Sequence, residues 1–328
     1  MAGDGTIRWG ILGTANIARA AFLPGLREAG GGRVVLVAGR EAARADAWAR
    51  EHGVTAGVAG YERVLEAEDL DAVYIPLPNT MHAHWTRQAL AAGKAVLTEK
   101  PLCVSVPETE AVLADAAEPG RLLWEAFVFP FHPQMERVRT LIAEGAIGEL
   151  GEIQSGFHFP VRSETNIRLR PELAGGALND VGCYPLHLAS GLFGEAPSTV
   201  LAASTLAPTG VDRETHGVLR FSHDRVLLFS SGIARGPDTR TRLLGTEGEI
   251  RLTNPFHPSP EDTLEWMSGD TVRVERPTDH RASFSPALAH IHAVLRGEEE
   301  PRHLAVTDTL ATARALAAVR TAAGRGGR

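Results

Sequence analysis

One lysine stands where it could hold the oxygen of a reacting group. Lys100 follows the short apolar run Ala95 to Leu97 and precedes Pro101, whose ring fixes the backbone dihedral of the turn. A lysine beside a buried strand is rarely enclosed unless it is paired or functional. We therefore expect the ammonium of Lys100 to point toward a ligand from a rigid turn.

A second segment, Gly175 to Ser190, carries a carboxylate, a phenol and an imidazole. If the segment is helical, Asp180, Tyr184 and His187 stand at i, i+4 and i+7 and project from one face. A phenol exchanges protons near neutral pH only if its pKa is lowered, and the ammonium of Lys100 would lower it. Each residue taken singly could be an ordinary packed side chain, and His187 stays in that class. The combination makes Lys100, Tyr184 and Asp180 the candidate catalytic residues.

The elements that would position these residues begin with a strand, a glycine turn and a helix. Ile7 to Gly13 is an apolar run, and Asn16 to Leu23 can open a helix. Small residues in such a turn let the backbone approach a pyrophosphate, whose charge the helix N-terminus favours. The same turn could also be a purely structural connection. The dinucleotide contacts predicted here are Gly10, Gly13, Thr14, Ala15, Asn16 and Ile17.

The second apolar run indicates which dinucleotide is bound. NAD-binding sheets usually carry an acidic residue at the end of this strand, whereas the present sequence has Gly39 followed by Arg40. An arginine can hold a 2′-phosphate as a fork, so we predict NADP in preference to NAD. The alternative is that Arg40 is a solvated residue at the start of a helix.

Further apolar runs alternate with helix-like segments and predict a doubly wound, parallel Rossmann sheet. These runs are Val34 to Ala38, Ala72 to Leu77, Ala95 to Leu97 and Leu122 to Trp124. Prolines at the end of the run Ala72 to Leu77 open a loop at the carboxyl edge of the sheet, where ligands bind. His82 and His84 are two residues apart and make a poor metal pair, so no metal is predicted. The remaining predicted cofactor contacts are Pro76, Leu77, Asn79, His82, Glu99 and Lys100.

After Trp124 the alternation of strand and helix stops, and strands follow one another. Such a succession predicts an α+β domain with a large, open and mainly antiparallel sheet. The predicted strands are Glu152 to Val161, Thr199 to Leu206, Gly217 to Ser222, Val226 to Ile233, Thr239 to Leu244 and Glu249 to Leu252. We predict two domains: residues 1–124 bind NADP, and residues 125–328 bind substrate and form a dimer.

Composition excludes several classes of function. The 328 residues carry a net charge of −7, which offers no basic surface for nucleic acid. Two cysteines, Cys103 and Cys183, fit no metal or redox spacing and favour a reduced setting. The polar start, Met1 to Thr6, lacks an export signal, and no later stretch is apolar enough to span a bilayer. We therefore predict a cytoplasmic protein that binds neither membrane nor nucleic acid.

Four stretches of the sequence resemble the glucose-fructose oxidoreductase, inositol dehydrogenase and MocA (Gfo/Idh/MocA) family. They are Trp9 to Ala18, Val73 to His82, Glu99 to Leu102 and Gly175 to Tyr184. In that family the lysine of Glu-Lys-Pro is catalytic and the bond to the proline is often cis, which maps onto Lys100 and Pro101. Tyr184 places the chain in the tyrosine-type branch, similar to D-xylose and dihydrodiol dehydrogenases, because inositol dehydrogenases have histidine there.

The resemblance implies hydride transfer between a nicotinamide and a carbinol or carbonyl carbon of a sugar or cyclic diol. Tyr184 would exchange the hydroxyl proton, and Lys100 would hold the substrate oxygen. Asp180 would orient a neighbouring hydroxyl and balance the charge of the lysine. The predicted substrate contacts are Lys100, Phe157, Asn166, Arg168, Asp180 and Tyr184.

Two alternatives remain open from the sequence. One is an NADPH-dependent 3-ketoreductase that acts on a nucleotide-linked deoxysugar with the same residues. The other is a catalytically silent NAD(P)-sensing regulator, although the intact Lys100, Asp180 and Tyr184 count against it. A homodimer or higher homo-oligomer is expected by analogy with the family.

Overall fold

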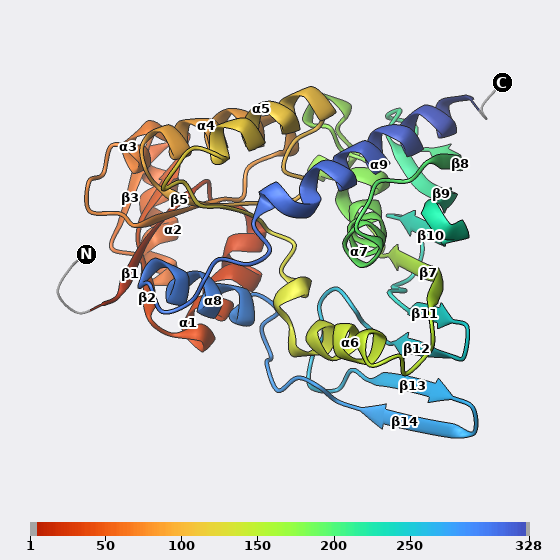
Figure 1. Ribbon diagram of the computed structural model, residues 1–328. Helices are drawn as coiled ribbons and strands as arrows, with labels where there is room; N and C mark the ends of the chain where they lie inside the picture. The colour runs from red at the N-terminus through yellow and green to blue at the C-terminus, as the bar shows by residue number, and fades with distance from the viewer. Residues whose placement is uncertain (1–4, 326–328) are drawn as a thin grey trace. The chain divides into compact units, whose positions relative to one another are not determined.

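The computed structural model describes residues 5–325, and its contacts divide the chain into two units (Figure 1). Within the described residues, the first unit consists of residues 5–103, 107–131 and 282–307, and the second of residues 104–106, 132–281 and 308–325. Residues 1–4, part of the start on which the localisation prediction depends, lie outside the described residues, as do 326–328. The units thus exchange segments, whereas a boundary between residues 124 and 125 would cut the chain once.

Among the described residues of the first unit, six strands form one parallel sheet, as predicted for a Rossmann fold. Their order is β3 (Ala56–Ala59), β2 (Gly32–Gly39), β1 (Ile7–Leu12), β4 (Ala72–Ile75), β5 (Ala95–Thr98) and β6 (Leu123–Glu125). The order reverses between β1 and β4, which places the binding crevice of such sheets at their carboxyl ends. Strand β3, a short edge strand of small and mostly half-buried residues, was not predicted from the sequence.

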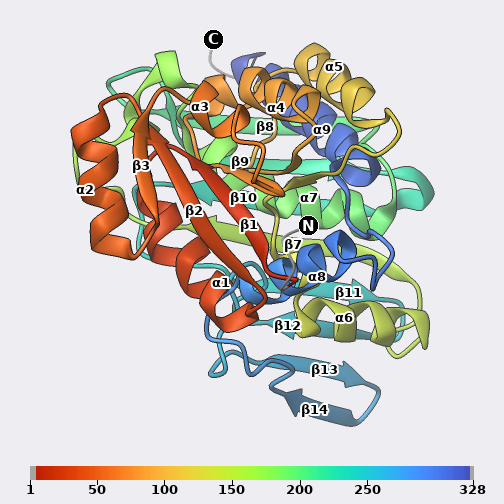
Figure 2. The ribbon, with the colours of Figure 1, turned by 90° about the vertical axis from the view of Figure 1, so that its left-hand side faces the viewer.

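Helices cover both faces of this sheet (Figure 2). One face carries α1 (Leu23–Ala29), α2 (Ala42–His52) and α8 (Ser285–Leu295), and the other carries α3 (Glu62–Leu65), α4 (His82–Ala91) and α5 (Val106–Ala116). The predicted first helix begins instead as a π-helical turn, Ala18–Phe22. Phe22 stacks on Tyr74 of β4, with ring centroids 4.2 Å apart. This stack fixes the helix of the glycine turn on the sheet.

Helix α8 joins the first unit because its apolar side completes that core. Phe284, Leu288 and Ile291 are buried in the same cluster as Trp9 and Phe22. His292 adds a polar connection, since the indole nitrogen of Trp9 donates to its Nε2 at 3.0 Å and its Nδ1 donates to the carbonyl of Gly30 at 2.8 Å. The ring is therefore held as one neutral tautomer.

We expect the free energy of unfolding to fall as the pH is lowered from 6.5 to 4. Burial, assisted by the charge of Arg296, lowers the pKa of His292 to about 4, so the unfolded chain binds the extra proton across this interval. One histidine shifted this far contributes about 3 kcal/mol, fully present above pH 6.5 and lost below it. Urea unfolding at several pH values measures the effect.

The matched variants are His292→Gln, which retains a donor and an acceptor, and His84→Gln, which alters an exposed histidine. His292→Gln should flatten the decline between pH 6.5 and 4, and His84→Gln should leave it unchanged. Equal slopes in all three proteins would contradict the assignment to His292.

In the second unit, eight strands of the described residues form one sheet, antiparallel except where β7 and β10 pair in parallel. Their order is β14 (Thr271–Glu275), β13 (Leu264–Ser268), β12 (Gly248–Leu252), β11 (Thr241–Gly245), β7 (Leu150–His158), β10 (Val226–Gly232), β9 (Asp212–Arg220) and β8 (Thr199–Leu206). The predicted large, mainly antiparallel sheet is confirmed. Strands β13 and β14 were not predicted, and β14 is an exposed edge strand.

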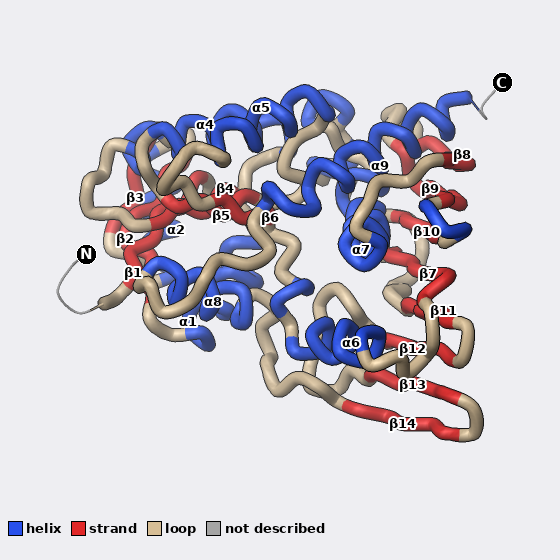
Figure 3. Tube along the Cα trace, in the orientation of Figure 1, coloured by secondary structure: helices blue, strands red, loops and turns tan. Residues whose placement is uncertain are grey.

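Three helices lie along one face of the second sheet (Figure 3). They are α6 (Pro133–Ala143), α7 (Cys183–Phe193) and the second-unit part of α9 (Ala305–Arg325). Helix α6 is tied to the far edge of the sheet by a two-pronged ion pair, because Arg137 donates to both carboxylate oxygens of Glu275 on β14 at 2.8 and 3.0 Å. Within residues 5–325, none of the helices has the length and apolar character needed to cross a membrane.

Candidate active site

The glycine turn after β1 has the geometry that close contact with a phosphate requires. Gly13 has a φ of +101°, and a Cβ atom there would lie 3.0 Å from Cδ2 of Leu77. Its N–H donates to the carbonyl of Ala38 at 2.7 Å, so the turn is fixed to β2. Thr14, Ala15, Asn16 and Ile17 follow at the start of the helix and are exposed or half-buried. This turn fits the pyrophosphate of a dinucleotide.

Gly10 has a different role from the one predicted. It lies inside β1, and a Cβ atom there would overlap Val64 and approach Cδ1 of Leu70 to 2.8 Å. The missing side chain therefore lets α3 pack on the sheet. Gly10 does not line the turn that Gly13 forms.

Gly39 and Arg40 stand at the end of β2, as the sequence predicts for a residue that selects the cofactor. Arg40 is exposed. Burial raises the pKa of the Tyr61 hydroxyl, while the positive charge of Arg40 acts in the opposite direction. The guanidinium of Arg40 therefore has an electrostatic effect on the hydroxyl of Tyr61. Arg40 follows the carboxyl end of β2, at the edge of the parallel sheet where ligands bind.

The turn that carries Lys100 is fixed by Glu99. One oxygen of Glu99 accepts from the hydroxyl of Tyr74 at 2.7 Å, and the other accepts from the backbone N–H of Lys100 at 3.3 Å. Tyr74 is fully buried in β4, and Glu99 and Lys100 are half-buried. The Lys100–Pro101 bond is cis, as the resemblance implies.

His82 lies beneath the ligand-binding edge and is fully buried. Its Nδ1 is 2.8 Å from the carbonyl oxygen of Pro101, and its Nε2 is 2.7 Å from that of Leu77. Burial, with the positive charge of Lys100, lowers the pKa of the ring despite these two carbonyls. The ring of His82 thus lies between the segment that carries Pro76, Leu77 and Asn79 and the turn that carries Lys100. Both ring nitrogens face backbone carbonyls of the protein, whereas the predicted role of His82 was to contact the cofactor.

In the second unit, Asp212 fixes the start of the segment that carries the other candidate residues. One of its carboxylate oxygens accepts from the N–H of Leu178 at 2.6 Å and from the hydroxyl of Thr215 at 2.9 Å. Gly176 has a φ of +105°, and a Cβ atom there would overlap this carboxylate. Asn179 is held by Arg320, whose guanidinium donates to it at 2.9 Å. The sequence analysis singled out neither Asp212 nor Arg320.

A π-helical turn lies at the start of the predicted row of Asp180, Tyr184 and His187. Leu178–Gly182 is a π-helical turn, which α7 then continues as an α-helix. A π turn adds a residue to the turn and shifts the faces that follow. Asp180 accordingly pairs with Arg168, and Tyr184 packs on aromatic rings. His187 contacts Thr312 of α9 at 3.0 Å, as a packed residue would.

Tyr184 is 5% exposed and lies in a cluster of rings. Its ring centroid is 5.1 Å from those of Phe157 and Phe256 and 5.4 Å from that of His257. Phe157 and Phe256 are themselves stacked at 5.5 Å. Phe157 was predicted from the sequence, whereas Phe256 and His257 were not. The one sequence signal of these two residues is that they stand as a pair of rings between two prolines. The cluster confines the phenol to one orientation.

The loop before this segment carries the two polar residues predicted to contact substrate. Asn166 accepts the backbone N–H of Arg168 at 3.0 Å and so shapes its own turn. Arg168 donates from Nε to an oxygen of Asp180 at 2.5 Å. The second unit therefore brings together Arg168 and Asp180, and it also brings together Phe157 and Tyr184.

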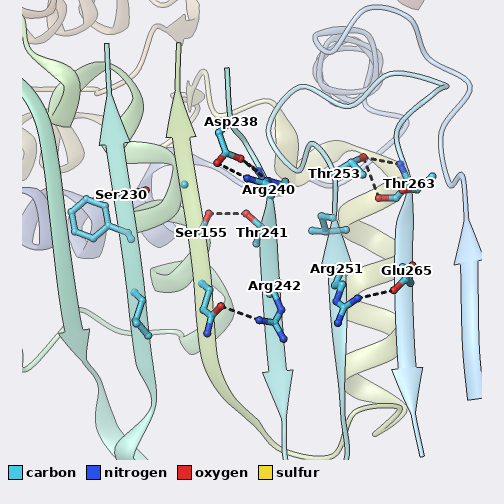
Figure 4. A pocket seen from close by; sticks show the side chains of 15 residues that line it. Ser155, Ser230, Asp238, Arg240, Thr241, Arg242, Arg251, Thr253, Thr263 and Glu265 are labelled. Atoms are coloured by element: carbon cyan, nitrogen blue, oxygen red, sulfur yellow. Dashed lines mark hydrogen bonds and ion pairs between the residues drawn. The ribbon is translucent and has the colours of Figure 1, made fainter. Parts of the chain in front are cut away.

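A groove of about 700 Å³ lies elsewhere in the second unit (Figure 4). It crosses β7, β10, β11, β12 and β13, and none of the predicted site residues lines it. Its arginines are paired, because Arg240 binds Asp238 through two nitrogens and Arg251 reaches Glu265 at 3.2 Å. These arginines are thus neutralised by carboxylates of the groove itself, and the groove is not part of the predicted site.

Comparison with protein families and known proteins identifies relatives of both halves of the chain. Residues 7–127 match a family model described as an oxidoreductase family with an NAD-binding Rossmann fold. Residues 135–251 match the model of the Gfo/Idh/MocA C-terminal domain.

Individual relatives align over most of their length. The dTDP-3,4-didehydro-2,6-dideoxy-alpha-D-glucose 3-reductase of Saccharopolyspora spinosa is 38% identical over 82% of this chain and 80% of its own. An NADP-dependent D-xylose 1-dehydrogenase of Haloferax volcanii is 35% identical over 90% of each chain. The crystal structure of a 3-ketoreductase from Actinomadura kijaniata with NADP and TDP-benzene superimposes with a TM-score of 0.87 and 31% identity, covering 96% of this chain and 97% of that one.

Proposed function

Since the chain belongs to the Gfo/Idh/MocA family of oxidoreductases, we propose that it transfers a hydride between NADP and a carbinol or carbonyl carbon of a sugar or cyclic diol. The observation that supports this most is the shared edge of the parallel sheet. The glycine turn follows β1 and the Lys100 turn follows β5, with β4 between them. In a parallel sheet these ends meet at one side, where such folds bind dinucleotides.

The chain's own residues would divide the chemistry as follows. NADP would supply or accept the hydride at C4 of its nicotinamide. The Gly13 turn would receive the pyrophosphate, and Asn79 would stand beside the nicotinamide. Lys100 would hydrogen-bond to the substrate oxygen, and Tyr184 would exchange the proton of that oxygen. Asp180 would orient a neighbouring hydroxyl.

The two units would carry separate tasks in this proposal. Cofactor binding belongs to the first unit, which contains Gly13, Arg40 and Lys100. Substrate binding and dimerisation belong to the second, which contains Arg168 and Tyr184. A cytoplasmic location is part of the same proposal and is supported by the two buried cysteine thiols, Cys103 and Cys183.

A second candidate is the reduction of a nucleotide-linked keto-deoxysugar. It is favoured by the relatives named as 3-reductases of a dTDP-linked sugar, one of which is 38% identical. A spectrophotometric screen discriminates the two candidates. Free sugars, polyols and cyclic diols are tested with NADP and NAD, and a dTDP-linked 3-keto sugar with NADPH, by absorbance of the reduced cofactor. Activity with none of these classes under either cofactor would contradict both candidates.

Arg40→Ala is expected to raise the KM for NADP about tenfold or more while changing the KM for NAD little, because a charge-assisted contact to the 2′-phosphate is lost. Initial rates with each cofactor measure the change. Arg50→Ala is the matched control, since Arg50 is an exposed arginine at the other end of α2, where it pairs with Asp46. Parallel losses with both cofactors would instead indicate damage to the fold.

We also propose a homodimer formed through the open face of the second sheet. Leu201, Val218 and Leu228 are 69%, 39% and 38% exposed, and they stand opposite one another on β8, β9 and β10. Val272 and Val274 are both 57% exposed on the far edge strand β14. Apolar rows of this kind mark interaction surfaces.

Val218→Glu is expected to shift the protein toward monomer, because it places a charge within the apolar row. Sedimentation velocity over a range of concentrations measures the shift. An exposed position outside the row, Glu118→Gln, should have no effect. A monomeric wild-type protein at all concentrations would contradict the dimer.

A further inference from the structure

The backbone of Arg168 is locked against the motif that contains Asp180. The side chain of Asn166 accepts the N–H of Arg168 at 3.0 Å, and the carbonyl of Arg168 accepts the N–H of Gly176 at 2.8 Å. A Cβ atom at Gly175 would lie 2.5 Å from that carbonyl oxygen. The glycine pair is therefore needed for this close approach, and the distance between Arg168 and Asp180 is set by the main chain.

The side chain of Arg168 then reaches Asp180 in a partly enclosed setting. Its Nε donates to Oδ2 of Asp180 at 2.5 Å, and its guanidinium lies 5.3 Å from the ring centroid of Phe159. The side chains of Asp180 and Arg168 are 13% and 36% exposed. An ion pair that is half-buried, hydrogen-bonded and set beside an aromatic ring is stronger than an exposed one.

A neighbouring arginine offers the contrast. Arg170 donates to Glu172 at 2.6 Å, but both side chains are more than half exposed and they are only two residues apart. The ion pair of Arg170 and Glu172 is therefore local to one turn. Arg168 instead binds the carboxylate of Asp180, a candidate catalytic residue twelve positions away in the sequence. The same loop therefore contains both the residue of interest and its matched control.

The pairing changes the role expected of Asp180. The resemblance implied that Asp180 balances the charge of Lys100, yet Asp180 has a guanidinium as counter-charge within its own unit. We propose that Arg168 is a positioning residue, which holds the carboxylate of Asp180 in the orientation that accepts a substrate hydroxyl next to the reacting carbon. This inference rests on the proposed function, in which Asp180 contacts that hydroxyl.

A carboxylate held by Arg168 would narrow the class of substrates that the protein accepts. A carboxylate oriented by a guanidinium is a fixed hydrogen-bond acceptor, and it discriminates strongly between substrates that do and do not present the matching hydroxyl. The substrate should therefore carry a hydroxyl vicinal to the carbon that is oxidised or reduced. A deoxy analogue that lacks it should lose turnover in the wild type more than in Arg168→Met.

The test compares Arg168→Met, Arg170→Met, Asp180→Asn and the double variant Arg168→Met/Asp180→Asn, with a substrate found in the screen. We expect Arg168→Met and Asp180→Asn each to lower kcat/KM by about tenfold or more, as for loss of a charge-assisted hydrogen bond. The double variant should lose no more than the worse single one, because both changes disrupt one unit. Arg168→Lys should recover part of the loss, and Arg170→Met should behave as the wild type.

Three other kinetic results would each contradict a specific part of the proposal. Losses that multiply in the double variant would show that Arg168 acts on the substrate by its own contact, which overturns the positioning role. A normal Arg168→Met beside an impaired Asp180→Asn would overturn the inference and keep the proposed function. Normal kcat/KM in Asp180→Asn would remove Asp180 from the site and overturn the inference, while the turnover itself would uphold the proposed hydride transfer. Fluorescence titration with NADPH, expected to be unchanged in every variant, separates these results from a damaged fold.

Discussion

Lys100→Ala is expected to lower kcat by about a thousandfold, the cost of removing one preorganised donor from the oxygen on which charge develops. The affinity for NADPH, measured by fluorescence titration, should stay close to that of the wild type, because the pyrophosphate turn and Arg40 stand on other strands. Single-turnover absorbance at the reduced nicotinamide reports the hydride step directly.

The chain provides a matched control, because its sequence contains only two lysines. Lys94 is buried in the same unit, and its ammonium donates to the carbonyls of Ala67 at 2.7 Å and Leu70 at 3.0 Å. Lys94→Met should lower the melting temperature while sparing kcat, which is the opposite pattern. A kcat in Lys100→Ala within threefold of the wild type, about 0.7 kcal/mol in barrier, would rule out the proposed role of Lys100.

Tyr184→Phe is expected to lower kcat by about a hundredfold to ten-thousandfold, the range attributed to a positioned acid or base. The substitution keeps the ring that packs on Phe157 and Phe256, so the fold and the cofactor affinity should be preserved. Steady-state kinetics across a range of pH values measure the effect. The pH dependence of kcat should lose the limb that reports the proton exchange.

Tyr61→Phe serves as the control, since Tyr61 is a half-buried phenol of the first unit that packs edge-on against Trp85. It should leave the pH profile unchanged. If Tyr184→Phe retained both the wild-type kcat and its full pH profile, the proton would have to be exchanged by another group.

Much of the fold could be predicted from local pattern. Continuous apolar runs such as Ala72 to Leu77 specify buried parallel strands, and five of the six strands of the first sheet were found in this way. The missed strands lack that signal, because β3 is made of small residues and β14 alternates charge with exposed valine. The assignment of helix α8 to the first unit could not be predicted in this way, because it depends on contacts with Trp9 and Phe22 far away in sequence.

Candidate site residues could be selected from the sequence where a residue pattern has few uses. A lysine before a proline and a glycine pair before an aspartate are specific, and the structure places Lys100 and Asp180 in defined turns. The supporting residues were not predictable. Asp212 fixes the segment by accepting the backbone N–H of Leu178, a residue 34 positions away in the sequence. The π turn at Leu178–Gly182 has no characteristic spacing of residues from which it could be predicted. Gly10 and His82 fitted a cofactor pattern but serve the interior.

The exchange of segments between the units has a consequence for synthesis on the ribosome. The first unit stops at residue 131 and resumes at residue 282, so the 150 residues from 132 to 281 are synthesised before the segment that contains α8. At bacterial or eukaryotic elongation rates that interval takes on the order of ten seconds or more. Until then the face around Trp9 and Phe22 lacks its cover. During that interval the nascent sheet exposes apolar surface of the kind that makes folding intermediates prone to aggregate, while the second unit is synthesised.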